Sequence, residues 1–279
     1  MGATEVAAAP PVALTIAGSD SGGGAGLQAD LRTFTACGVH GCVAVTAVTV
    51  QNSRAVSGIV EIPPSTVADQ IRAVTSDIGV AAAKTGMLAS AGIISAVAKV
   101  CDEVGLGASV PLVVDPVAAS MHGDPLLAAD ALDELRTELF PRATLVTPNL
   151  DEVRLLIGLD VQSRAQQYDA ARALHAWGPQ WVLVKGGHLH DDPECLDLLY
   201  DGHDFTPFTG PRVATPHTHG SGDTLAAAIT SALARGATIP VAVRYGKHYI
   251  RQAVAHAYPL GAGVGPVSPF WRLLPVEPC

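Results

Sequence analysis

The sequence predicts an α/β fold in which one mostly parallel central sheet carries helices on both of its faces. Short apolar runs rich in Val, Ile and Ala alternate with segments of helical period along most of the 279 residues. Aromatic residues make up only 5% of the chain, and small apolar side chains suit helices packed closely on a parallel sheet. Polar residues recur where the apolar runs end, at the edge where such sheets bind ligands.

The first half of the chain repeats the order strand, loop, helix. An apolar run at 12–16 predicts a buried strand, and the glycine-rich loop at 18–26 leads from it into a helix over 27–34. A second strand is predicted over 42–50. The elements predicted next are a helix over 65–78, a strand over 80–84, a helix over 91–104, a strand over 110–114 and a helix over 126–139.

The second half continues this alternation and then adds a hairpin. The predicted elements are a strand over 143–147, helices over 150–157 and 164–177, a strand over 181–185, and two long helices over 220–235 and 241–257. Two short runs, 196–200 and 205–208, flank Asp201-Gly202 and predict an antiparallel hairpin. Glycines and prolines from Gly261 onward predict a surface strap. We expect one domain over 12–279 after a disordered tail over 1–11.

Composition excludes several classes of partner and location. The net charge is −9 and no basic cluster occurs, so nucleic acid and anionic membranes are not expected partners. The five cysteines are odd in number and form no Cys-x-x-Cys, which indicates a reducing compartment. No apolar run reaches transmembrane length, and the first eleven residues lack the regions of a signal peptide. We therefore expect a cytoplasmic protein.

The stretch at 219–229 predicts an anion site. Gly220, Ser221 and Gly222 precede a strong helix former, so their backbone amides should converge at a helix N-terminus. Such a terminus suits a phosphate or a phosphoryl group in transfer. Asp223 lies in the same turn, where it either caps the helix or acts in chemistry.

Polar side chains follow the predicted strands in an orderly way. They are Asp20, Gln51, Lys84, Asp115, Asn149 and Lys185. Each alone is explained as a turn residue, a cap or a solvated end. Because carboxyl ends of parallel strands meet at one edge of a sheet, the set together favours a binding site there.

Two weaker patterns suggest other functions. Gly24-x-Gly26-x-x-Ala29 fits a dinucleotide fingerprint and raises a nicotinamide oxidoreductase as an alternative. The acidic residue expected about 20 residues further on is missing, which argues against it. The His-x-His pairs at 188 and 190 and at 217 and 219 lack a carboxylate or cysteine at metal-ligand spacing, so loop histidines are the better interpretation.

Taken in order, seven stretches resemble the hydroxymethylpyrimidine/phosphomethylpyrimidine kinase family of the ribokinase superfamily. They are residues 17–30, 49–52, 84–88, 114–117, 147–152, 184–188 and 220–225, and the match extends from about residue 12 to residue 260. The resemblance implies a ribokinase-like three-layer fold. It also implies Mg²⁺-dependent transfer of phosphate from ATP to 4-amino-5-hydroxymethyl-2-methylpyrimidine, then to its monophosphate, in thiamine diphosphate biosynthesis.

The resemblance also implies roles for individual residues. The positions that match the family's pyrimidine pocket are Gly18, Asp30, Gln51, Met87 and Val117. A carboxylate and an amide can pair with an aminopyrimidine edge, and Met87 and Val117 can hold the ring between them.

Other matching positions concern the phosphates. Asp115, Asn149 and Lys185 match positions near ATP, and Glu152 matches a residue that holds Mg²⁺ through water, together with Asp115. The implied catalytic set is Asp223 with Gly220, Ser221 and Gly222. Relatives are often dimers, so a homodimer is expected.

Two departures from the family pattern leave alternatives open. Many members carry Cys at the position of Asp223. Ribokinase and many pyridoxal kinases carry Asp there, as this chain does, so a pyridoxal kinase is an alternative. The usual lysine after Asp115-Pro-Val is absent, and His122 stands nearby instead. A non-catalytic pyrimidine-binding protein is a third possibility, against which the retained Glu152 and Lys185 argue.

Overall fold

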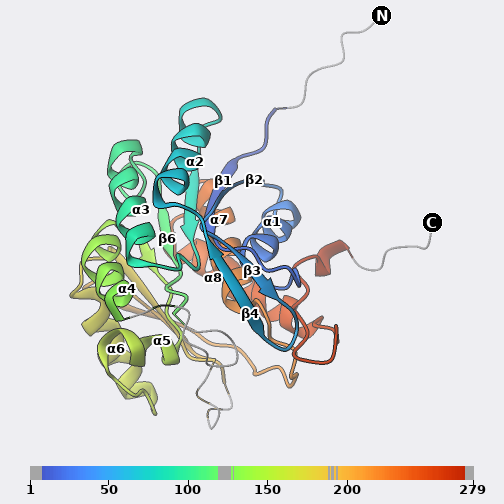
Figure 1. Cartoon of the computed structure of the whole chain (residues 1–279). Helices are drawn as coiled ribbons and strands as arrows, with labels where there is room; N and C mark the ends of the chain where they lie inside the picture. Colours follow the sequence, from blue (N-terminus) through green and yellow to red (C-terminus); the bar gives the residue numbers. More distant parts are fainter. Residues whose placement is uncertain are drawn as a thin grey trace, which may run out of the picture.

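An eight-stranded sheet forms the centre of the computed structural model, which describes residues 8–118, 127, 129–187, 189, 192 and 194–273. Its strand order is β10-β9-β8-β7-β6-β5-β1-β2 (Figure 1). The strands are β1 (Val12–Ala17), β2 (His40–Val45), β5 (Ala82–Thr85), β6 (Leu112–Val114), β7 (Leu145–Val146), β8 (Trp181–Lys185), β9 (Asp197–Tyr200) and β10 (Phe205–Phe208). Strands β2, β1, β5, β6, β7 and β8 pair in parallel in this order, and the predicted hairpin β9–β10 extends the sheet antiparallel at one edge.

Helices cover both faces of the sheet, which confirms the predicted three-layer fold (Figure 1). One face packs against α2 (Pro64–Asp77), α3 (Ala91–Val104), α4 (Ala129–Glu134), α5 (Leu150–Ile157) and α6 (Arg164–His175). The other face packs against α1 (Gly26–Ala36), α7 (Ser221–Ala234) and α8 (Ile239–Ala255).

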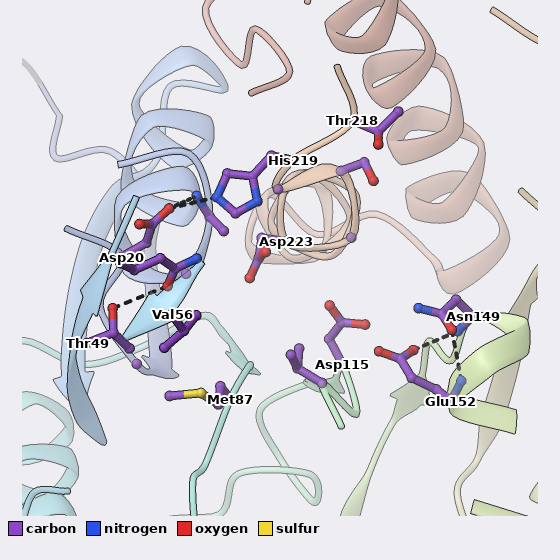
Figure 2. Close-up of a pocket in the computed structure, with 18 of the residues that line it drawn as sticks. Asp20, Thr49, Val56, Met87, Asp115, Asn149, Glu152, Thr218, His219 and Asp223 are labelled. Atoms are coloured by element: carbon purple, nitrogen blue, oxygen red, sulfur yellow. Dashed lines mark hydrogen bonds and ion pairs between the residues drawn. The ribbon is translucent and has the colours of Figure 1, made fainter. Parts of the chain in front are cut away.

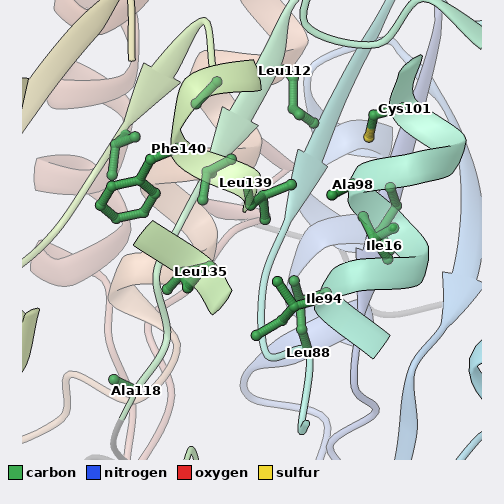
Figure 3. Close-up of a cluster of buried hydrophobic side chains, with 14 of the residues drawn as sticks. Ile16, Leu88, Ile94, Ala98, Cys101, Leu112, Ala118, Leu135, Leu139 and Phe140 are labelled. Atoms are coloured by element: carbon green, nitrogen blue, oxygen red, sulfur yellow. The ribbon is translucent and has the colours of Figure 1, made fainter. Parts of the chain in front are cut away.

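Strand β1 shows why two separate cores form. Side chains alternate across a strand, so Leu14 and Ile16 join the core under α2 and α3, while Ala13 joins the core under α7. Figure 3 shows the first core, where Ile16 and Leu112 from the sheet meet Ile94 and other residues of α3. The sheet is therefore buried on both faces, as its continuous apolar strands predict.

Helix α7 is the most deeply buried helix on its side of the sheet, since residues 224–234 are all buried. Its small side chains allow α8 to come close, and a β-carbon added at Gly246 of α8 would lie 2.5 Å from Cγ1 of Ile229. This packing fixes the N-terminus of α7 at the carboxyl edge of the parallel strands.

The predicted strand over 42–50 is in fact two strands. The chain turns out of the main sheet at Thr46, whose hydroxyl donates to the carbonyl oxygen of Met87 at 2.7 Å. It then forms β3 (Ala47–Gln51), which pairs antiparallel with β4 (Val56–Glu61) in a separate two-stranded sheet. We did not predict β4, and this β3–β4 hairpin forms one wall of the site described below.

Smaller differences concern element ends. Within the described residues, the helix predicted over 126–139 starts at Ala129 as α4 and continues as a π-helical turn, η1 (Leu135–Leu139), and a 3-10 turn, η2 (Phe140–Arg142). The stretch after Gly261 is more than a surface strap, because Val267 and Ser268 are buried before the last turn, η3 (Trp271–Leu273). Residues 1–7 of the predicted tail, His122, His188 and His190 lie outside the described residues.

No helix in the described parts of the chain is long and apolar enough to cross a membrane.

Candidate active site

A cavity of about 440 Å³ opens at the carboxyl ends of the parallel strands, between the β3–β4 hairpin and the N-terminus of α7 (Figure 2). Of the residues predicted for the site, the following line it: Gly18, Gln51, Met87, Asp115, Val117, Asn149, Glu152, Lys185, Gly220, Ser221, Gly222 and Asp223. Of the residues expected at this edge, Asp30 and Lys84 do not line the cavity. The orderly placement of polar residues after strands therefore does gather them at one edge.

One end of the cavity is lined by both apolar and polar groups. The amide of Gly18 donates to the carbonyl oxygen of Met87 at 3.1 Å, and a β-carbon at Gly18 would lie 2.5 Å from Cε of Met87. Thr49 donates to Oε1 of Gln51 at 3.2 Å, which orients this amide at the cavity wall. An apolar methionine beside a polar amide suits a flat heteroaromatic ring with hydrogen-bonding edges.

The glycine-rich loop at 18–26 is organised by Asp20. Its Oδ1 accepts from the amide of Gly22 at 2.7 Å, and its Oδ2 accepts from those of Gly24 and Ala25 at 2.9 Å each. Nε2 of His219 also lies 2.9 Å from Oδ2. Burial raises the pKa of Asp20, but His219 and the backbone amides outweigh burial, so the pKa lies below its usual value.

The loop is in close contact with the first residues of α7. Gly220 has φ of +75°, in the left-handed region, and a β-carbon there would lie 1.9 Å from the carbonyl oxygen of Gly24. Only glycine fits such a position. Asp20 was among the polar residues expected at the site, but its pairing with His219, which precedes the Gly-Ser-Gly stretch, was not predicted.

The N-terminus of α7 provides part of the predicted anion site. The amide of Ser221 donates to the carbonyl oxygen of Thr218 at 3.1 Å, so it is not free for a ligand. For Gly222 and Asp223 no backbone partner is found within the described part of the chain. Gly222 lies against two charged groups, since a β-carbon there would be 3.4 Å from Nζ of Lys185 and 3.5 Å from Oδ2 of Asp115.

The other end of the cavity carries a buried charged cluster. Nζ of Lys185 lies 2.9 Å from Oδ1 of Asp115 and 3.8 Å from Oε2 of Glu152. Burial opposes the charge of Lys185, but Asp115 and Glu152 outweigh burial and raise its pKa. Burial raises the pKa of Glu152, and Lys185 opposes this shift without cancelling it.

The Asn-x-x-Glu pair has a structural role as well. Asn149 is the N-cap of α5: its side chain accepts from the amide of Glu152 at 2.9 Å, and Oε2 of Glu152 accepts from the amide of Asn149 at 2.7 Å. This reciprocal capping box fixes both side chains at the cavity wall.

The structure corrects the expected place of Asp30. Its carboxylate is fully buried behind the cavity and accepts from Nζ of Lys84 at 3.0 and 2.9 Å and from the hydroxyl of Thr15 at 2.6 Å. Helix α1 turns Asp30 toward the sheet, together with Leu27 and Phe34. Asp30 therefore does not line the cavity at which the other predicted pyrimidine-binding residues meet.

Comparison with known proteins identifies the family. A family model described as phosphomethylpyrimidine kinase matches residues 20–268. The chain belongs to this family. A hydroxymethylpyrimidine/phosphomethylpyrimidine kinase of Mycobacterium tuberculosis is 61% identical over 264 residues, which cover 95% of this chain and 95% of the relative. A thiamine biosynthesis bifunctional protein of Geobacter sulfurreducens is 47% identical over 255 residues, 91% of this chain and 51% of that protein.

A solved structure agrees with the predicted fold. The ADP complex of Bacillus subtilis pyridoxal kinase superposes with a TM-score of 0.88 at 37% identity, covering 95% of this chain and 99% of that chain. The family match confirms a phosphotransferase with ATP as co-substrate. It supports the pyrimidine kinase prediction over the pyridoxal kinase alternative, and it gives no support to a nicotinamide oxidoreductase.

Proposed function

We propose that this enzyme transfers the γ-phosphoryl group of ATP to the hydroxyl of 4-amino-5-hydroxymethyl-2-methylpyrimidine and then to the resulting monophosphate, in thiamine diphosphate biosynthesis. The observation that carries the proposal is the position of Asp223. Figure 2 shows it between the Thr49 and Met87 end of the cavity and the Asp115 and Glu152 end. A pyrimidine at the first end and a nucleotide at the second would meet at this carboxylate.

Asp223 acts as the general base in the first step. Its side chain is 15% exposed and sits in the first turn of α7, at the cavity wall. A carboxylate there takes the proton of the substrate hydroxyl as its oxygen attacks phosphorus, and a positioned base contributes roughly 10²–10⁴-fold to the rate. Asp performs this role without the ionisation step that a cysteine needs.

The transferred phosphoryl group is stabilised by fixed positive charge. The free amides at the start of α7 and the ammonium of Lys185 meet beside Gly222, whose missing side chain leaves the space open. Preorganised donors of this kind stabilise the charge that spreads over the equatorial oxygens in phosphoryl transfer.

We propose that Mg²⁺ binds with the nucleotide on the Asp115 and Glu152 side. No group of three or more metal-ligating side chains occurs among the described residues. That agrees with kinase sites, which hold Mg²⁺ by one or two carboxylates plus water and phosphate oxygens. Oδ1 of Asp115 is taken by Thr147 and Lys185, while Oδ2 faces Gly222 at the phosphate end. Bound there, the ion would neutralise part of the negative charge of the nucleotide phosphates.

The two phosphorylation steps give the test of this proposal. In the second step the nucleophile is a phosphate oxygen, ionised near neutral pH with a second pKa of about 6, so it needs no base. Asp223→Asn should lower the single-turnover rate of the alcohol step by roughly 10²-fold or more and affect the monophosphate step far less. Equal losses in both steps would show that Asp223 acts through positioning or metal binding instead. Pyridoxal, assayed in parallel, should react more slowly than the pyrimidine.

We further propose a homodimer in the cytoplasm. The outer face of the β3–β4 hairpin carries Val48, Val50 and Val60, which are 48%, 59% and 64% exposed. A contiguous exposed apolar face of a small sheet is the usual mark of a protein interface, and a second copy of the chain would cover it. Sedimentation should show a dimer that Val48→Lys with Val60→Lys converts to monomer, and a monomeric unmodified protein would contradict the proposal.

Free Cys37, Cys42 and Cys101, all buried, are consistent with a reducing compartment.

A further inference from the structure

A buried chain of charges runs behind the catalytic carboxylate. Lys84, on the central strand β5, is fully buried, and its ammonium lies 3.0 and 2.9 Å from the two oxygens of Asp30. The same ammonium lies 3.9 Å from Oδ1 of Asp223. Thr15 donates to Asp30 at 2.6 Å and completes its hydrogen bonding.

Stability alone does not explain this arrangement. Replacing a buried ion pair by apolar residues of similar volume is often neutral or stabilising, because both charges lose their hydration. Burial opposes the charge on Lys84, yet Asp30 and Asp223 outweigh burial and raise its pKa. Burial raises the pKa of Asp30 to about 7, although Lys84 opposes this. The ammonium is therefore retained as a charge, in the presence of two carboxylates.

The space between Lys84 and Asp223 is kept open by a glycine. A β-carbon at Gly86 would lie 3.4 Å from Nζ of Lys84, 3.9 Å from Oδ1 of Asp223 and 3.0 Å from Cβ of Ala17. A larger residue would enter the region that separates the two charges. The end of β5 is thus shaped so that the ammonium faces the carboxylate directly.

We propose that Lys84, held in place by Asp30, is a positioning residue for Asp223. The ammonium attracts Oδ1, which fixes the rotation of the carboxylate and leaves its other oxygen toward the substrate hydroxyl. Asp30 holds Lys84 from the far side with both oxygens, so the ammonium does not move forward to form a close ion pair that would reduce the basicity of Asp223. This inference rests on the proposed role of Asp223 as the base.

A double-mutant cycle tests the proposal, because residues that act through one another are not additive. Lys84→Met should lower the single-turnover rate of the alcohol step by about 10- to 100-fold, part of the roughly 10²–10⁴-fold that a base contributes. In the Asp223→Asn background the same substitution should change this rate by less than about threefold, since the group that it positions is gone. The KM for the pyrimidine should stay within about threefold, because Lys84 does not line the cavity.

A second variant distinguishes a loss of positioning from a folding defect. Lys84→Met leaves the carboxylate of Asp30 buried without its partner, which is destabilising. Asp30→Asn combined with Lys84→Met removes both charges and nearly keeps their shapes, and it should show the same loss in the alcohol step. The monophosphate step is the internal control: a folding defect lowers both steps, whereas a loss that acts through Asp223 lowers the alcohol step selectively.

The outcomes separate this inference from the proposed function. If Asp223→Asn alone leaves the alcohol step unchanged, the base assignment fails and the role of Lys84 fails with it. If Asp223→Asn is severe but Lys84→Met lowers the rate equally in both backgrounds, only the positioning role is overturned. Equal losses in both phosphorylation steps for the neutral double variant would overturn it as well.

Discussion

Asp20 ties the glycine-rich loop to the start of α7, and its replacement by asparagine tests how the site is held together. The carboxylate accepts from the amides of Gly22, Gly24 and Ala25 and lies 2.9 Å from Nε2 of His219. Asparagine has one acceptor oxygen and an amino group. Whichever way the side chain turns, either Gly22 or the pair Gly24 and Ala25 faces a donor instead of an acceptor.

The magnitude follows from the number of bonds lost. Hydrogen bonds to a charged group contribute about 1.5–3 kcal/mol each, and an unsatisfied buried donor adds its own cost. With one or two amide bonds lost, Asp20→Asn should lower the free energy of unfolding by about 2–4 kcal/mol. Urea unfolding followed by circular dichroism measures this value. The KM for the pyrimidine should rise in the same variant, because Asp20 and its loop line the cavity.

The pH dependence of stability gives a second reading of the same residue. The pKa of Asp20 in the folded protein lies below its usual value of 3.8, so its contribution is present above the unfolded pKa and is lost as the pH falls through the folded pKa. The difference in unfolding free energy between the unmodified protein and Asp20→Asn should therefore be constant above about pH 5 and shrink below about pH 4.

Asp77→Asn is the matched control, since Asp77 is exposed at the end of α2. Asp77→Asn should change the free energy of unfolding by no more than about 0.5 kcal/mol. Two results would refute the reasoning. One is a loss of less than about 1 kcal/mol in the unfolding free energy of Asp20→Asn. The other is a difference in unfolding free energy between this variant and the unmodified protein that does not shrink at acid pH, since either result means that this carboxylate does not hold the loop.

Two further predictions concern the two ends of the cavity. Gln51→Ala should weaken pyrimidine binding by on the order of 1–3 kcal/mol and leave ATP binding nearly unchanged; calorimetry that finds unaltered pyrimidine affinity removes Gln51 from the pocket. Glu152→Gln keeps an acceptor for the capping box of α5, so it should preserve the fold and raise the Mg²⁺ concentration needed for half-maximal rate at fixed ATP. An unchanged Mg²⁺ requirement would contradict the metal assignment.

Much of the site could be predicted because chain order and strand direction determine where the loops meet. In a parallel sheet, every strand that is followed by a polar residue delivers it to the same edge. Asp115 after β6, Asn149 after β7 and Lys185 at the end of β8 therefore meet at one cavity although they are far apart in sequence. Nothing beyond strand position was needed for this expectation.

Asp30 shows where position in a motif was not enough. Leu27, Asp30 and Phe34 are spaced at i, i+3 and i+7, which places all three on one helix face. Leu27 and Phe34 are apolar, so this spacing is a signal for burial of Asp30 that our sequence analysis did not use. Its partner Lys84 is 54 residues away along the chain, and no local pattern predicts that pairing.

The β3–β4 hairpin was missed for a different reason. Residues 42–50 form one run of apolar and β-branched residues without Gly or Pro, which hides the turn at Thr46. In the structure burial alternates along β3, with Ala47 and Thr49 buried and Val48 and Val50 exposed, but valines on the exposed face leave no polar–apolar alternation in the sequence. Such alternating burial is typical of a half-buried antiparallel strand rather than a central parallel one.

The two buried lysines divide the chemistry of the site between them. Lys84 on β5 is held by Asp30 behind the hydroxyl end, and Lys185 on β8 is held by Asp115 at the phosphate end. Each ammonium approaches the reaction centre beside a glycine, Gly86 or Gly222 respectively, so no side chain comes between the charge and its target.

Because both lysines are locked by carboxylates before any ligand binds, their charges need little reorganisation during the reaction. An acidic protein with a net charge of −9 can then hold the phosphates of its substrates through Lys185 and the free amides of α7 instead of a basic surface. The planar guanidinium of arginine is larger than an ammonium and spreads its charge over a fork. The compact ammonium of Lys84, bonded to both oxygens of Asp30 with Gly86 beside it, therefore suits this enclosed position better than a guanidinium.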